Sequence, residues 1–126
     1  MTNHVAAARR LIEAGRTDLA ARELRDAIAR DPGDGTAHGL LSLCLTNDGH
    51  HPQALAASDA ALRLVPEDAF AWRVRTVIFV NLHRSDDAQT AAEQALRLDP
   101  GHSQSFVVRG QARLLAGLYE SALADF

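Results

Sequence analysis

Cysteine is nearly missing and lysine wholly missing from this chain of 126 residues: Cys44 stands alone, and all thirteen basic residues are arginine. A single cysteine excludes a disulfide-stapled scaffold and favours a reducing compartment, so we expect a cytoplasmic protein. No apolar run is longer than that at 77–80, which is far too short to span a bilayer. No apolar stretch follows Arg9 and Arg10 either, so we expect no signal peptide and no membrane contact within this segment.

Valine and isoleucine are also scarce, with ten residues together against 24 alanines and 17 leucines. This bias favours helix and leaves few of the β-branched residues that strands prefer, which predicts an all-α fold. Glycine-rich phosphate loops, paired-cysteine metal motifs and the common hydrolase motifs are absent. We therefore expect no enzyme, no catalytic residue, no cofactor and no metal. The net charge of −3 argues against a nucleic-acid partner.

What the sequence does contain is a repeat of 34 residues. Asp31-Pro32, Val65-Pro66 and Asp99-Pro100 follow one another at this spacing. The same spacing aligns alanines at four positions, namely Ala20, Ala54, Ala88 and Ala122. It also aligns Gly15, Gly49 and Gly117, with His83 in the third slot, and the small residues Ala8, Ser42, Thr76 and Gly110. Chance does not produce so many matches with one period, so the chain is a repeat array.

Each repeat predicts two helices. The first, or A, helices are expected near 3–14, 36–48, 69–82 and 103–116, and the second, or B, helices near 18–30, 52–64, 86–98 and 120–126. Pro52 suits the first turn of a helix, and Ser85 is expected to cap the helix that follows it. The recurring prolines end each B helix. The alanine series is expected to face the A helices, because two helices approach closely only where side chains are small.

These residues resemble the tetratricopeptide repeat (TPR), a helix–turn–helix unit of 34 residues. The resemblance implies a right-handed α-solenoid, which we expect to form one domain with repeats at 1–34, 35–68 and 69–102 and a partial repeat at 103–126. We predict seven helices, the last one short. Departures from the family pattern are Arg75 and Arg109, where leucine is usual, and Arg113, where a large apolar residue is usual. The family places an aromatic residue at a position that holds Trp72 and Phe106 in the last two repeats. The first two repeats hold His4 and His38 at this position.

The resemblance also implies a function, because A helices of the family line a concave groove that binds peptides. The groove candidates that it implies are Val5, Arg9, Leu43, Asn47, Phe70, Arg73, Val77, Asn81, Gln104 and Gln111. Asn47 and Asn81 are one repeat apart and are expected to hydrogen-bond the backbone of an extended peptide. The slots that grip a C-terminal carboxylate in some family members hold Val5, Arg9, Leu40, Phe70 and Val74, four of them apolar, so that mode of recognition is not expected.

The charges on the helices predict the sign of the partner's charge. The A helices carry six arginines and one glutamate, a net charge of +5, whereas the B helices carry five arginines and nine acids. A relatively positive inner face predicts an acidic peptide. His50, His51 and His83 lie in equivalent turns; solvated turn residues are the expected reading, and a shared metal ion is the alternative.

The chain stops within its fourth repeat, and we expect it to be the N-terminal part of a longer bacterial protein. We expect the apolar end formed by Leu118, Tyr119, Leu123 and Phe126 to pair two copies. The main prediction is a protein-interaction scaffold that binds an extended or helical peptide. The alternatives are a self-assembling repeat array, or a regulatory region whose effector or transmembrane part lies beyond residue 126.

Overall fold

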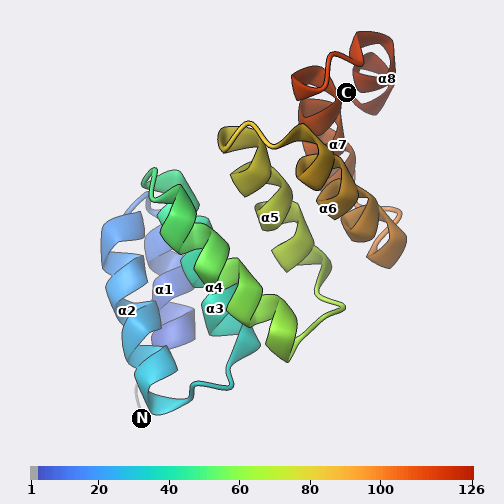
Figure 1. The fold of residues 1–126 in the computed structure, drawn as a ribbon. Coiled ribbons are helices and arrows are strands. Elements are labelled where there is room, and N and C mark those ends of the chain that lie inside the picture. The colour runs from blue at the N-terminus through green and yellow to red at the C-terminus, as the bar shows by residue number, and fades with distance from the viewer. Residues whose placement is uncertain (1–2) are drawn as a thin grey trace. The chain divides into compact units, whose positions relative to one another are not determined.

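A computed structural model describes residues 3–126, and all of its regular structure is helical (Figure 1). The A helices are α1 (His4–Glu13), α3 (Gly35–Asn47), α5 (Ala69–Asn81) and α7 (Ser103–Leu115). The B helices are α2 (Thr17–Arg30), α4 (His51–Leu64), α6 (Ser85–Leu98) and α8 (Tyr119–Asp125). The expected all-α fold is confirmed, with no strand among residues 3–126. The expected number of seven helices is wrong: residues 3–126 form eight, one in each of the eight ranges expected from the repeat.

The helices pack as antiparallel hairpins in two compact units. In the first unit, which ends at Pro66, α1 packs on α2, α3 packs on α4, and α2 also contacts α3. In the second unit, Glu67–Phe126, α5 packs on α6, α7 packs on α8, and α7 also contacts both α5 and α6. Each unit therefore consists of two hairpins that share a core.

The turns inside the hairpins require a left-handed backbone. Gly15, Gly49 and Gly117 have φ angles of 76°, 81° and 80°, which glycine adopts without a steric penalty. His83 fills the same slot in the third hairpin with φ 56°, and it is the only residue other than glycine with positive φ among residues 3–126. This turn begins each B helix at a fixed distance from the end of the A helix.

The helix starts differ between the two classes. Every A helix is preceded by a cap residue whose side chain accepts a hydrogen bond from a backbone N–H of the first turn; these residues are Asn3, Asp34, Asp68 and His102. The B helices lack such caps. The expectation that Ser85 caps α6 is wrong, because the turn at His83 starts the helix one residue earlier and makes Arg84 the cap residue. Pro52 lies in the first turn of α4, as expected.

Small side chains fill the contact between the helices of each hairpin. The four alanines of the B-helix series, Ala20, Ala54, Ala88 and Ala122, are fully buried. Ala8, Ser42 and Thr76 on the A helices are also fully buried, and Gly110 is buried at the same position of α7. Both series are therefore buried, which agrees with the expectation that the helices of a hairpin approach closely through small side chains.

Aromatic residues are confined to the second unit. The chain has four phenylalanines, one tryptophan and one tyrosine. All six follow Pro66, at Phe70, Trp72, Phe79, Phe106, Tyr119 and Phe126. The first unit therefore builds its core from aliphatic side chains and Cys44, which is fully buried.

Within residues 3–126, every helix is too short or too polar to cross a bilayer.

Candidate peptide-binding surface

In the first unit, the candidate residues lie on α1 and α3, which contact each other. Val5 and Leu43 are half-buried, whereas Arg9 and Asn47 are exposed. Beside Val5, a hollow of about 470 Å³ extends between the start of α1 and the loop before α3, lined among others by Arg30, Asp31 and Asp34. The first unit therefore offers apolar side chains next to one exposed guanidinium and one exposed amide.

In the second unit, the candidate residues lie on α5 and α7, which pack side by side. Phe70 and Val77 of α5 are half-buried and seven residues apart, so they share one face of the helix. Asn81 at the end of α5 is exposed, and so are Gln104 and Gln111 of α7. The side-chain amides of these three residues and of Asn47 make no hydrogen bond within residues 3–126. The α5–α7 pair thus combines apolar patches with unpaired amides.

Arg73 does not present an open cation, although its position belongs to the candidate set. Only 13% of its side chain is exposed, and its Nη1 lies 3.9 Å from a carboxylate oxygen of Asp99. The same nitrogen donates to the hydroxyl of Ser105, at 3.5 Å. Arg73 therefore joins α5 to the start of α7, and part of its charge is neutralised within the unit.

Arg75 and Arg109, which depart from the repeat pattern, also have local partners. The guanidinium of Arg75 lies over the ring of Phe79, 5.0 Å from its centroid, and that of Arg109 lies 5.4 Å from the centroid of Phe106. On the first unit, Arg9 and Arg10 are exposed. The positive charge expected on the A helices is thus most accessible on α1.

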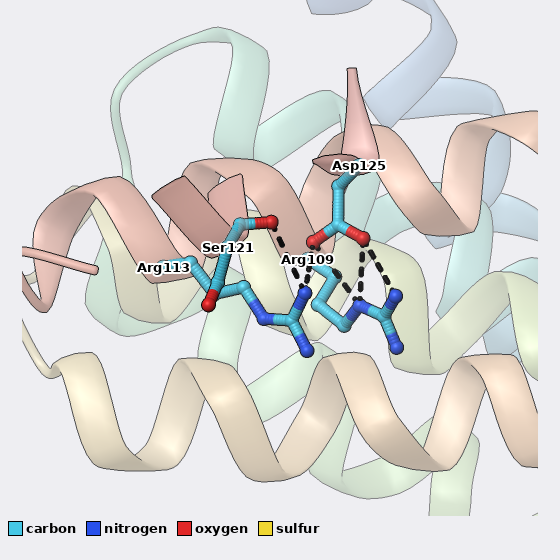
Figure 2. Close-up of polar contacts among 4 residues, drawn as sticks. All are labelled: Arg109, Arg113, Ser121 and Asp125. Carbon is cyan, nitrogen blue, oxygen red and sulfur yellow. Dashed lines mark hydrogen bonds and ion pairs between the residues drawn. The ribbon is translucent and has the colours of Figure 1, made fainter. Parts of the chain in front are cut away.

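Arg109 and Arg113 both hold one carboxylate, as Figure 2 shows. Arg109 donates from Nε to both oxygens of Asp125 at 3.1 Å, and from Nη2 to Oδ1 at 2.6 Å. Arg113 donates from Nη1 to Oδ2 of Asp125 at 2.9 Å and to the carbonyl oxygen of Ser121 at 3.3 Å. The Asp125 side chain is only 1% exposed. The hydrogen bond from Arg109 to Asp125 raises the pKa of the guanidinium further above its ordinary value.

This arginine–carboxylate cluster was missed by sequence reasoning, although a signal for it exists. Asp125 occupies the B-helix position that holds Glu23, Ala57 and Ala91 in the other repeats. An acid at a position facing the A helix, opposite two arginines four residues apart, indicates a pair between the two helices. In the first hairpin, the Glu23 carboxylate likewise makes a polar contact with its A helix. Its Oε2 lies 2.7 Å from Nδ1 of His4.

The histidines in the aromatic slot make polar contacts. Nε2 of His38 lies 3.1 Å from the carbonyl oxygen of Pro32. Because a carbonyl oxygen can only accept, this nitrogen donates the hydrogen bond.

The turn histidines were the candidates for a metal site. His50 is exposed at the start of α4, and Nδ1 of the neighbouring His51 is buried without a hydrogen-bond partner in the described part of the chain. No group of three or more histidine, cysteine or acidic side chains within residues 3–126 is arranged to hold a metal ion.

Comparison with known proteins identifies the family to which this architecture belongs. A tetratricopeptide repeat family model matches residues 5–69 and 78–126. Tetratricopeptide repeat protein 33 from Xenopus laevis is 28% identical over 103 residues, which are 82% of this chain and 38% of that protein. The same protein from Homo sapiens is 32% identical over 80 residues, 64% of this chain and 30% of its own length. The chain therefore spans about a third of these relatives.

Solved structures agree on the fold. The thermophilic TPR protein TTC0263 of Thermus thermophilus superposes with a TM-score of 0.91 at 22% identity, covering 98% of this chain and 69% of that one. The first TPR domain of the human RPAP3 protein gives 0.86 at 14% identity, covering 93% and 92%. The hairpins, the small-residue contacts and the family match lead to one conclusion: the chain belongs to the tetratricopeptide repeat family and has its α-solenoid fold.

Proposed function

We propose that the chain binds an extended or helical peptide segment of a protein partner on the exposed faces of its A helices, as a non-catalytic module. Membership of the family makes it a protein-interaction scaffold in general. The observation that carries the finer proposal is the α5–α7 pair, where Asn81, Gln104 and Gln111 present unpaired amides beside half-buried Phe70 and Val77.

The chemistry of these groups suits a peptide backbone. A carboxamide both donates and accepts hydrogen bonds, so it can pair with the N–H and C=O groups of an extended chain whatever its sequence. The apolar side chains between the amides would hold side chains of the ligand, as in most binding sites, where a few polar groups orient a mainly apolar contact. Asn47, Val5 and Leu43 offer the same combination on the first unit.

The preferred ligand is an amide-rich or acidic peptide. Arg9 is exposed and carries no ion pair within the described residues, so it can attract a carboxylate. Arg73 contributes less, since Asp99 lies beside it. Binding should weaken as salt rises, because exposed charges are screened beyond about 8–10 Å at physiological ionic strength.

A peptide array of acidic, amide-rich and basic sequences tests the proposal with the whole chain as the probe. Asn47→Ala combined with Asn81→Ala, and separately Gln104→Ala combined with Gln111→Ala, are expected to weaken binding to the array hits. The matched control is Gln53→Ala, which removes an exposed amide from a B helix. If both double variants bind every hit as the unchanged chain does, the A-helix faces are not the site.

Self-association is the second candidate function, and a specific observation favours it. Residues 3–126 contain seven large hydrophobic side chains that are exposed, and five of them belong to the end of the second unit. We call this set the C-terminal face; it consists of Leu114, Leu118, Tyr119, Leu123 and Phe126. Exposed apolar patches of a few hundred Å² mark interaction sites.

A cytoplasmic location and a bacterial source stay predictions from composition.

A further inference from the structure

A hollow of about 480 Å³ lies in the first unit, between the start of α3 and the end of α4. These two helix ends approach each other closely: a Cβ built on Gly35, the first residue of α3, would lie 3.4 Å from Cβ of Leu64, the last residue of α4. We call this space the His38 hollow. Its lining consists of Pro32, His38, Ala60, Arg63 and Leu64.

The third repeat provides an internal reference for the His38 hollow. The residue 34 positions after His38 is Trp72, which is half-buried. At the end of α6, the side-chain oxygen of Gln94 accepts a hydrogen bond from Nε of Arg97 at 3.1 Å. The third repeat therefore has an indole ring at this position, and its arginine has an acceptor.

The second repeat has smaller side chains at the positions of both the indole and the carboxamide. An imidazole stands at His38 in place of the indole, and a methyl group stands at Ala60 in place of the carboxamide. Arg63 corresponds to Arg97, but it is exposed and makes no hydrogen bond or ion pair with any described residue. The hollow thus lies where the third repeat places an aromatic ring, and it has an unpaired cation at its edge.

The first repeat shows that the hollow accompanies the histidine. His4 stands in the same slot, and a hollow of about 470 Å³ lies beside it as well. Two aspartates and one arginine line that hollow, so their charges offset one another. The described residues that line the His38 hollow include Arg63 and no acid. Of the two hollows, the one beside His38 is therefore suited to a ligand that carries negative charge.

Arg63 determines which ligand groups fit. An exposed guanidinium next to apolar carbon atoms attracts the face of an aromatic ring, and it forms short, charge-assisted hydrogen bonds with a carboxylate. The chain already uses arginine on aromatic rings, since the guanidinium of Arg84 lies 4.8 Å from the centroid of Phe79. The imidazole of His38 is held by its hydrogen bond to the Pro32 carbonyl and offers a second flat ring for contact.

We propose that the His38 hollow binds an aromatic side chain, tryptophan above all, from a peptide segment of a protein partner in which an acidic residue neighbours the aromatic one. The aromatic ring occupies the place that Trp72 takes in its own repeat, and the carboxylate pairs with Arg63. This site goes beyond the proposed function, because none of its lining residues belongs to the candidate set on the A helices. A partner that engages both sites gains avidity from two weak contacts.

A titration of the whole chain followed by nuclear magnetic resonance tests the proposal. The probe is a short peptide, blocked at both ends, with one tryptophan between two aspartates. We expect saturable shifts of the backbone amides of residues 60–64, with a dissociation constant on the order of 1 mM for a single anchoring side chain. A peptide with leucine in place of tryptophan should give no saturable shifts. A peptide with asparagine in place of both aspartates should bind about fivefold more weakly, because it loses an exposed ion pair.

Two variants test the lining of the hollow. His38→Trp combined with Ala60→Gln copies the side chains of the third repeat into the second, so this chain should no longer bind the probe and should unfold at a higher temperature. Arg63→Gln should weaken binding about fivefold and leave the circular dichroism spectrum unchanged. The matched control is Arg25→Gln, which alters an exposed, unpaired arginine of α2 and should leave binding unchanged.

Several results would overturn the proposal. These are unchanged binding by Arg63→Gln or by a folded His38→Trp/Ala60→Gln chain, saturable binding of the leucine peptide, equal binding of the asparagine peptide, and shifts confined to α5 and α7. Asn47→Ala combined with Asn81→Ala should bind the probe as the unchanged chain does. Failure of the A-helix faces and failure of the His38 hollow are therefore separate results.

Discussion

His83 and Gly49 occupy the same position of successive hairpin turns, with φ angles of 56° and 81°. A left-handed backbone costs a residue with a Cβ roughly 1–2 kcal/mol, and part of the benefit of glycine is offset because glycine is more flexible in the unfolded chain. We expect His83→Gly to raise the free energy of unfolding of the second unit by about 0.5–1 kcal/mol. Urea denaturation measures this change. The reverse exchange, Gly49→His, should destabilise the first unit, and equal stability in all three chains would contradict the argument.

Replacement of Asp125 tests the arginine–carboxylate cluster. Asp125→Asn leaves two guanidinium groups facing each other without their anion, and we expect α8 to detach from α7. The loss in global stability should stay within about 1–3 kcal/mol, because a detached helix lets both arginines reach water. Amide hydrogen exchange of residues 119–126 is the direct measurement and should accelerate strongly. Glu120→Gln, which alters an exposed acid on the same helix, is the control and should leave exchange unchanged.

Cys44 predicts a pH dependence at the alkaline end. Burial raises the pKa of its thiol from 9.0 to about 11, with a smaller contribution from the charge of Asp48. Because the folded state holds the proton more tightly than the unfolded state, the stabilisation is fully present below pH 9.0 and is lost as pH rises through about 11. The two-unit difference corresponds to at most about 3 kcal/mol. Cys44→Ala should flatten the stability profile over this range, and an identical slope in both chains would contradict the prediction.

Substitution of Gly110 tests how much space remains between α7 and α8, the two helices of the last hairpin. A Cβ built on Gly110 would lie 2.7 Å from Cε1 of Phe126 and 3.2 Å from Cβ of Asp125. The phenylalanine ring is largely exposed and can move, and alanine, serine and threonine occupy this slot in the other hairpins. We expect Gly110→Ala to change stability by less than about 1 kcal/mol and Gly110→Leu to cost about 1–3 kcal/mol through overpacking. Thermal unfolding that ranks the two variants equally would refute this.

The helices could be predicted from the sequence because their limits depend on local backbone chemistry. Each of the eight expected ranges agrees with an observed helix to within one residue at either end. Glycine in a left-handed turn and proline after a helix act where they stand, whatever the rest of the chain does. The error at Ser85 has the same origin: the turn at His83 fixes the helix start, and the capping preference of serine is too weak to move it.

The candidate site was predictable only in part. Exposure of Asn47, Asn81, Gln104 and Gln111 follows from their helix positions, and the family pattern supplied those positions. The contacts of Arg73 with Asp99 and of Arg109 with Asp125 were not predicted, because each acid occurs at a position where another repeat has an apolar residue. A net charge summed over the A helices cannot show which arginines are neutralised inside their own unit.

The confinement of all aromatic residues to the second unit decides which optical signals can follow unfolding. Fluorescence of Trp72 and near-ultraviolet absorption of Tyr119 originate after Pro66, so the first unit is spectroscopically silent in both. Far-ultraviolet circular dichroism records the helices of both units alike. A transition that appears earlier or later by circular dichroism than by fluorescence would therefore measure, without any added label, how independently the all-aliphatic half of the chain unfolds.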